Sequence, residues 1–181
     1  CGDVVIEPHR DLTLHIISMT PREREGDVIW INPTDPDRTF GLNPLDYGGD
    51  PRLRSTVGAA FISVLEKISE DSFSKYQRMS RVLENVTYAV LEGIEQPTLL
   101  HLVAFLREEA YRAEVIGQVE NPEVKSFWEK EFPAMGKNQA EVLAPLFNRL
   151  SPLLIKPLTR QVVGQARTTI PMRQMIDAGL L

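Results

Sequence analysis

Three side chains near the start of the chain are of types that perform acid–base chemistry. Glu7, His9 and Asp11 place two carboxylates and an imidazole between an apolar run and an apolar helical pattern. Carboxylates and imidazoles are the usual general acids and bases of enzymes. Around them, however, the sequence shows no nucleophile, oxyanion site or set of metal ligands. A simpler interpretation is that Glu7 ends a strand and Asp11 caps a helix. Of three hypotheses, an enzyme centred on His9 is therefore the least favoured.

The remaining sequence contains no familiar catalytic motif. The Gly-Lys pair at 136–137 lacks the earlier Gly and the following Ser or Thr of a phosphate-binding loop. The three histidines are not spaced as zinc ligands. Cys1 has no His or Asn partner in a recognisable nucleophile setting. We therefore predict no catalytic residue, no metal site and no cofactor bound by this chain alone.

Composition narrows the class of protein. The 181 residues are 43% apolar and 25% charged and include one Cys, which excludes a disulfide scaffold and a disordered tail. No apolar run reaches the roughly 18 residues of a membrane span. The 20 basic and 25 acidic residues give a net charge of −5. Because a non-specific nucleic-acid binder normally carries a basic field, this chain alone does not fit that class. The single Cys requires no oxidising compartment, which favours the cytoplasm.

The elements that would position Glu7, His9 and Asp11 form a strand–helix–strand pattern. Val4–Ile6 and Val28–Ile31 are short apolar runs typical of buried strands, and Leu12–Ile17 has helical spacing. This order predicts a βαβ-like unit at the edge of a parallel sheet. Two strands do not form a stable sheet alone, so the unit needs further strands.

From residue 50 onward the pattern becomes helical. Turn and cap residues separate several amphipathic segments: Asp50-Pro51, Gly93, Pro97-Thr98, Asn121-Pro122, and Asn138 with Glu141 as a capping box. The predicted fold is therefore mainly α: a helical, bundle-like domain preceded by a small βαβ-like α/β edge.

Several segments together resemble one protein family. They are VVIEPHRDL at 4–12, DVIWINPTDPDR at 27–38, FGLNPL at 40–45, FWEKEF at 127–132 and GQARTTI at 164–170. In this order they resemble a region of the conjugative DNA-transfer ATPases. That family is the type IV secretion coupling-protein branch of the RecA-like DNA-pumping ATPases, which belong to the P-loop NTPases. The resemblance covers nearly the whole chain.

The resemblance also implies where Glu7, His9 and Asp11 would lie in the fold. In the family, a strand ending in Asp-Pro-His-Gly-Asp-Leu follows the phosphate-binding loop and its helix. Here Glu7 stands for the Asp and Arg10 for the Gly. The resemblance thus makes Glu7, His9 and Asp11 candidates for the nucleotide-facing edge of an incomplete RecA-like sheet. The phosphate-binding loop and the acidic Mg-binding strand would lie outside residues 1–181, so ATP and Mg are implied for the parent protein and not for this chain.

The resemblance also implies an organisation and a set of partners. Residues 1–49 would be part of the RecA-like motor domain, 50–165 an inserted all-α domain, and 166–181 the return toward the motor sheet. The helical part would serve recognition and regulation in a bacterial DNA-translocating ATPase that acts in conjugation. Its partners would be the rest of the parent in a hexameric ring, DNA, and a relaxase or accessory protein. The segment itself would make no membrane contact, and the resemblance allows a membrane-associated parent.

The alternative is a self-contained helical protein-interaction module. The chain opens on Cys1 without an initiator Met, so this version includes a lipoprotein anchored through Cys1. Lipoproteins usually place a polar tether after the Cys, whereas an apolar run begins here at Val4. We therefore favour an internal fragment of a longer chain.

Overall fold

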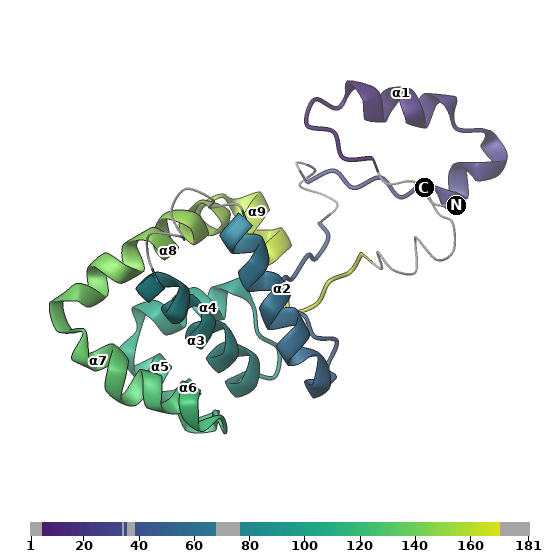
Figure 1. The fold of residues 1–181 in the computed structure, drawn as a ribbon. Coiled ribbons are helices and arrows are strands. Elements are labelled where there is room, and N and C mark those ends of the chain that lie inside the picture. Colours follow the sequence, from purple (N-terminus) through teal and green to yellow (C-terminus); the bar gives the residue numbers. More distant parts are fainter. Residues whose placement is uncertain (1–4, 34, 36–38, 68–76, 171–181) are drawn as a thin grey trace.

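The computed structural model describes residues 5–33, 35, 39–67 and 77–170, and helices dominate this part of the chain (Figure 1). The α-helices of the larger part are α2 (Arg54–Lys67), α3 (Gln77–Gly93), α4 (Leu99–Arg107), α5 (Glu109–Gln118), α6 (Pro122–Ser126), α7 (Phe132–Ala134), α8 (Gln139–Ile155) and α9 (Pro157–Val163). A π-helical turn at Phe127–Glu131 joins α6 to α7. The N-terminal part contains α1 (Asp11–Met19) and a 3-10 turn at Arg22–Asp27. The prediction of a mainly α fold is confirmed.

Helix α3 is the centre of the helical part. It packs against α2, α4, α5, α6 and α8 (Figure 1). Its inward side chains are almost fully buried: Met79, Val82, Leu83, Val86, Ala89, Val90 and Leu91. The connected core runs in sequence from Leu45 to Leu150. Residues 45–150 therefore supply a core of their own, without a contribution from the N-terminal part.

An aromatic cluster fills one end of this core. Phe105 of α4 lies edge-on to Trp128, with ring centroids 4.7 Å apart and an interplanar angle of 77°. Phe127 and Phe132 also pack on Trp128, at centroid distances of 5.1 and 4.7 Å. The guanidinium of Arg112 lies 5.1 Å from the centroid of Phe132 and donates a hydrogen bond of 3.2 Å to the carbonyl oxygen of Phe105. These contacts tie α4, α5 and the π-helical turn together.

The predicted helix caps at Asp50 and Asn121 are confirmed. Asp50 accepts a hydrogen bond from the backbone of Arg52, and Asn121 caps α6 in the same way. The predicted capping box of Asn138 and Glu141 is wrong, because Asn138 makes no side-chain cap bond. The chain enters α8 through a 3-10 turn at Gly136–Asn138, which already satisfies part of the first turn.

The start of α4 makes stability depend on pH. The backbone N–H of Thr98 donates to Nδ1 of His101 at 3.1 Å, and burial lowers the pKa of His101 below its usual value near 6.5. The unfolded chain therefore binds a proton more readily than the folded one below pH 6.5. We expect the free energy of unfolding to fall as pH drops below 6.5 and to level off below the folded-state pKa. Urea unfolding from pH 8 to 5 measures this loss.

His101→Gln is the matched variant for that measurement. Glutamine suits this position of a capping box but does not titrate, so the pH-dependent loss should become smaller. An unchanged slope in the variant would assign the pH dependence to other groups.

The predicted βαβ edge is not formed in the described residues. Helix α1 confirms the central helix, but the described part of the chain contains no β-strand. Val28–Ile31 is not paired in a ladder, and Ile29 and Trp30 are 39% and 46% exposed. Of the other predicted strand, Val4 lies outside the described residues and Ile6 is 91% exposed. The physical reason is that a strand is stable only with hydrogen-bonded neighbours, which the described residues do not supply.

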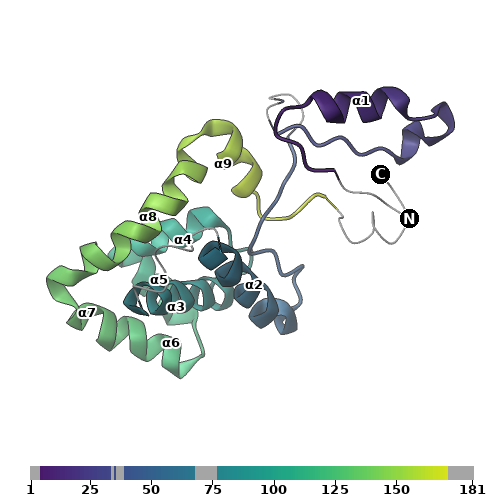
Figure 2. The same ribbon diagram turned by 45° about the horizontal axis from the view of Figure 1, so that its top comes forward.

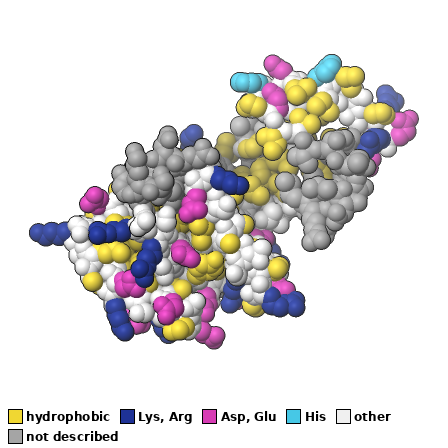
Figure 3. All heavy atoms as spheres, viewed as in Figure 1, with side chains coloured by type: hydrophobic (Ala, Val, Ile, Leu, Met, Phe, Trp, Pro, Cys, Tyr) yellow, Lys and Arg dark blue, Asp and Glu magenta, His cyan; other side chains and the backbone are white. Residues whose placement is uncertain are grey.

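The N-terminal part stands apart from the helical part (Figures 1 and 2). Helix α1 has no buried residue, although it carries apolar side chains on several sides. The large apolar side chains exposed in this part are Val5, Ile6, Leu12, Leu14, Ile16, Met19, Ile29 and Trp30. Figure 3 shows hydrophobic side chains gathered on the surface of this N-terminal part, at the upper right of the view. A helix with apolar side chains on several sides is normally covered by other elements.

Within the ranges that the structure describes, no helix is both long and apolar enough to cross a bilayer.

Candidate functional site

The structure places Glu7, His9 and Asp11 in and just after a turn that leads into α1. The Glu7 carboxylate accepts a hydrogen bond of 2.7 Å from the backbone N–H of His9 and a longer one, 3.5 Å, from the hydroxyl of Thr13. His9 and Asp11 are exposed. The predicted cap is displaced by one position, because α1 begins at Asp11 and Arg10 occupies the N-cap without a side-chain cap bond. Glu7 therefore stabilises the turn, and the three side chains do not form a closed site among the described residues.

Arg10 has an unusual backbone conformation in the same turn. Its φ is +71°, and among the described residues it is the only residue other than glycine with positive φ. The guanidinium of Arg10 lies 5.6 Å from the centroid of the Trp30 ring. This left-handed conformation costs a non-glycine residue about 1–2 kcal/mol. The turn before α1 thus has a geometry that suits glycine.

The strongest polar arrangement lies where the helical part begins and ends. The entry segment (residues 39–46) and the exit segment (residues 164–170) run side by side, and we call the pair the neck (Figure 2). The N–H of Thr169 donates to the carbonyl of Gly41 at 2.9 Å, and the N–H of Leu42 donates to the carbonyl of Val162 at 3.0 Å. The Thr169 hydroxyl in turn accepts from the N–H of Gly41 at 2.8 Å. The two ends of the helical part are therefore held together.

Asn43 is the centre of the neck. Its side chain is 4% exposed and makes hydrogen bonds in three directions. The amide donates to the carbonyls of Ala166 in the exit segment and Pro97 before α4, both at 2.8 Å. Its oxygen accepts from the N–H of Leu45 at 3.0 Å. One buried amide thus joins the entry segment, the exit segment and the α3–α4 connection.

Thr168 and Asp46 form a second link in the neck. The N–H of Thr168 donates to the Asp46 carboxylate at 2.7 Å, and the Thr168 hydroxyl accepts from the N–H of Asn43 at 3.1 Å. The other Asp46 oxygen accepts from the N–H of Gly48 at 2.9 Å. Backbone donors therefore satisfy both oxygens of this carboxylate.

Gly41 is required by the close approach of the two segments. A Cβ at Gly41 would clash with the backbone carbonyl oxygen of Arg167 and would also press on Gln165. A side chain at this position would therefore push the exit segment away.

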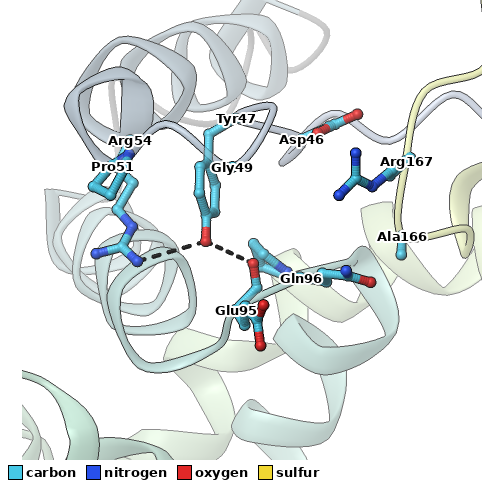
Figure 4. A pocket seen from close by; sticks show the side chains of 10 residues that line it. Asp46, Tyr47, Gly49, Pro51, Arg54, Glu95, Gln96, Ala166 and Arg167 are labelled. Carbon is cyan, nitrogen blue, oxygen red and sulfur yellow. Dashed lines mark hydrogen bonds between the residues drawn. The ribbon is translucent and has the colours of Figure 1, made fainter.

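A cavity of about 250 Å³ lies at the base of the neck (Figure 4). The residues that line it come from the entry segment and the turn after it, from the start of α2, from the α3–α4 connection and from the exit segment: Asp46, Tyr47, Gly49, Pro51, Arg54, Glu95, Gln96, Pro97, Ala166 and Arg167. The Tyr47 hydroxyl donates to the carbonyl of Glu95 at 2.6 Å, and the Arg54 guanidinium lies 5.1 Å from the Tyr47 ring centroid. The cavity is thus built from segments far apart in the sequence.

Sequence reasoning identified the neck segments but not their pairing. FGLNPL at 40–45 and GQARTTI at 164–170 were recognised only as parts of the family resemblance. The roles of Asn43 and Thr168, and the cavity between Tyr47 and Arg167, were missed. The available signal was an Asn next to Pro44 between apolar residues, which indicates a buried, bonded amide.

Comparisons with known proteins identify no relative: no family model, no curated protein and no solved structure matches the chain. In the described part of the chain, no group of three or more His, Cys, Asp or Glu side chains is placed to hold a metal ion.

Proposed function

We propose that this chain is part of a DNA-translocating ATPase of the conjugative, type IV secretion coupling type. Residues 50–165 are its inserted all-α domain, which acts in recognition and regulation. Residues 1–49 and 166–181 belong to the RecA-like motor domain and to the connections with it.

The observation that carries the proposal is the paired neck. An inserted domain must leave and rejoin its host at nearly the same place, because the host chain on both sides belongs to one fold. Asn43 and Ala166 are 123 positions apart and are joined by a hydrogen bond of 2.8 Å. Both neck segments lead from the helical part toward the N-terminal part (Figure 2). This is the topology expected of an insertion.

The turn before α1 supports the family assignment. The family pattern has Gly where this chain has Arg10, and the turn holds Arg10 at a φ of +71°. Glycine adopts this conformation without steric cost. The backbone thus keeps the shape expected of the family pattern although the side chain differs.

The uncovered N-terminal part fits a position inside a larger α/β domain. Helix α1 has no buried residue, and Trp30 and Ile6 are exposed. In doubly wound folds, helices pack on a sheet and parallel strands are buried on both faces. Further strands of a motor sheet would cover these side chains and pair with Val28–Ile31.

The charge of the chain favours a protein partner for the helical domain. Residues 1–49 carry 4 basic and 9 acidic residues, whereas residues 50–165 carry 14 basic and 15 acidic residues and are nearly neutral. A nearly neutral domain lacks the basic field that a tight grip on the phosphate backbone requires. Docking to a relaxase or another accessory protein suits such a surface better, and DNA would contact other parts of the ring.

ATP and Mg²⁺ would be bound by other segments of the parent. The sequence of this chain contains no phosphate-binding loop, and the described residues contain no cluster of metal ligands. No step of ATP hydrolysis is therefore assigned to these residues. Glu7, His9 and Asp11 remain candidates for the edge that faces the nucleotide in the complete bacterial motor, which would act in the cytoplasm.

The alternative, a self-contained interaction module, agrees with the core that residues 45–150 supply by themselves. That observation suits both hypotheses, since an inserted domain also needs its own core. Cys1, on which lipid anchoring depends, lies outside the described residues.

ATP hydrolysis by the parent protein and by this chain tests the proposal. We expect the isolated chain to show no turnover above buffer, because it has no phosphate-binding loop. The parent should hydrolyse ATP and respond to DNA. In the parent, replacement of residues 44–167 by a short Gly-Ser linker should preserve folding and basal turnover, because the neck brings these ends together. Stimulation by the accessory partner should be lost.

The control deletes residues 80–115, whose ends lie inside the helical core, and should yield an unfolded helical domain. A parent without a phosphate-binding loop upstream of Cys1 would contradict the proposal. Turnover by the isolated chain that Glu7→Gln abolishes would also contradict it.

A further inference from the structure

The neck cavity is lined by two acidic and two basic side chains, which differ in how they are bonded. Four charged side chains line it: Asp46, Arg54, Glu95 and Arg167. Backbone N–H groups of Gly48 and Thr168 already satisfy the Asp46 carboxylate. Glu95 is exposed, and Figure 4 shows its side chain directed away from Tyr47 and Arg167. Of the four charged side chains, the two arginines are therefore the ones that can attract an anion.

Arg167 is the donor that reaches the cavity most directly. Figure 4 shows its side chain extending from the exit segment toward the space between Asp46 and Gln96. Arg167 is exposed, and within the described residues no hydrogen bond or ion pair holds its guanidinium. A guanidinium presents paired N–H donors that match carboxylate and phosphate oxygens.

Arg54 lines the cavity beyond the Tyr47 ring in the same view (Figure 4). Its Nε atom is buried, and the described residues provide it with no hydrogen-bond partner. Its closest polar partner is the Tyr47 hydroxyl, at a long 3.5 Å from Nη2. Because the Nε atom is closed to water, it is also closed to a ligand, so Arg54 contributes its positive charge to the cavity and no bond from this atom.

The volume limits what the cavity admits. Sites for drug-sized ligands have volumes of about 300–1,000 Å³, and this cavity has about 250 Å³. It admits an acidic side chain or a phosphate group but not a whole nucleotide.

We propose that the neck cavity binds a small oxyanion, a carboxylate or a phosphate group, with Arg167 as direct donor and Arg54 as the second positive charge. The ligand would be held by the exit segment and attracted by the charge of Arg54, so its binding would restrain the exit segment of the neck. The proposal is independent of the ATPase assignment, because it depends only on residues 46–167.

NMR titration of the full chain tests this site. Inorganic phosphate and acetate are the two probes, with sodium chloride at equal ionic strength as the reference. We expect saturable shifts confined to residues around Tyr47, Ala166 and Arg167. Tighter binding of phosphate would indicate a phosphate-bearing ligand, and tighter binding of acetate an acidic side chain.

Two variants and one control make the result specific. Arg167→Gln removes the direct donor from an exposed position and should weaken binding about tenfold, the effect of losing one hydrogen bond to a charged group. Arg54→Gln should also weaken binding. Arg160→Gln removes the same charge from an exposed position of α9 and should change nothing. Shifts that match those in chloride, or unchanged affinity in Arg167→Gln, would overturn the proposal.

Discussion

Asn43→Ala is expected to lower the free energy of unfolding of the helical part by about 3 kcal/mol. The substitution removes two donated hydrogen bonds and one accepted bond from a side chain that is 4% exposed. Each such bond contributes about 1 kcal/mol, and the carbonyls of Pro97 and Ala166 would remain buried without this donor. The loss should separate the neck segments before the rest of the core unfolds.

Urea unfolding of the full chain, followed by far-UV circular dichroism, measures the effect. Hydrogen exchange at Leu45 and Thr169 reports on the neck itself. Asn148→Ala is the matched control, because Asn148 is an exposed residue of α8 and its loss should change stability by less than about 0.5 kcal/mol. Equal effects of the two substitutions would show that Asn43 does not hold the neck.

Trp128→Ala should destabilise the helical part by about 4 kcal/mol. Trp128 is 4% exposed and contacts Phe105, Phe127 and Phe132. Its indole N–H donates to the carbonyl of Asn85 in α3 at 3.2 Å. Truncation of a buried aromatic side chain leaves a cavity and typically costs about 3–5 kcal/mol. The lost hydrogen bond adds to this cost, and partial collapse of the site reduces it.

The midpoint of urea unfolding by circular dichroism measures this change as well. Trp30→Ala is the matched control: Trp30 is 46% exposed and lies in the N-terminal part, outside the helical core. It should leave the helical transition nearly unchanged. A shift as large as that of Trp128→Ala would mean that the two parts unfold as one unit.

The two substitutions separate two functions of the helical part. Trp128 stabilises the core, whereas Asn43 determines how the ends of that core are presented. If the helical part is inserted in a motor, Asn43→Ala should weaken its coupling to the host even at a temperature where the core stays folded.

Local sequence signals were sufficient for most of the helices. The cap of Asn121 and the helix start after Thr98 are as predicted. The reason is that caps and helical periodicity act within a few residues. The Asn138–Glu141 prediction failed because a competing local structure, the 3-10 turn at Gly136–Asn138, begins the helix instead.

Non-local features could not be derived in the same way. The apolar run Val28–Ile31 predicts a strand, but a strand requires partners, and the described residues supply none. Glu7 was singled out for chemistry, and the structure gives it a local bond to the backbone of His9. Side-chain types alone did not distinguish these two roles.

The helical class, the absence of catalytic motifs and most helix boundaries follow from the sequence, because they depend on short-range patterns. The neck and its cavity depend on the folded core, which carries Ala166 and Thr168 back to Asn43 across more than 120 positions. Long-range hydrogen bonds of this kind produce no periodic pattern in a sequence. The packing of the intervening helices determines which two residues meet. The candidate site of this protein is therefore a product of its tertiary structure.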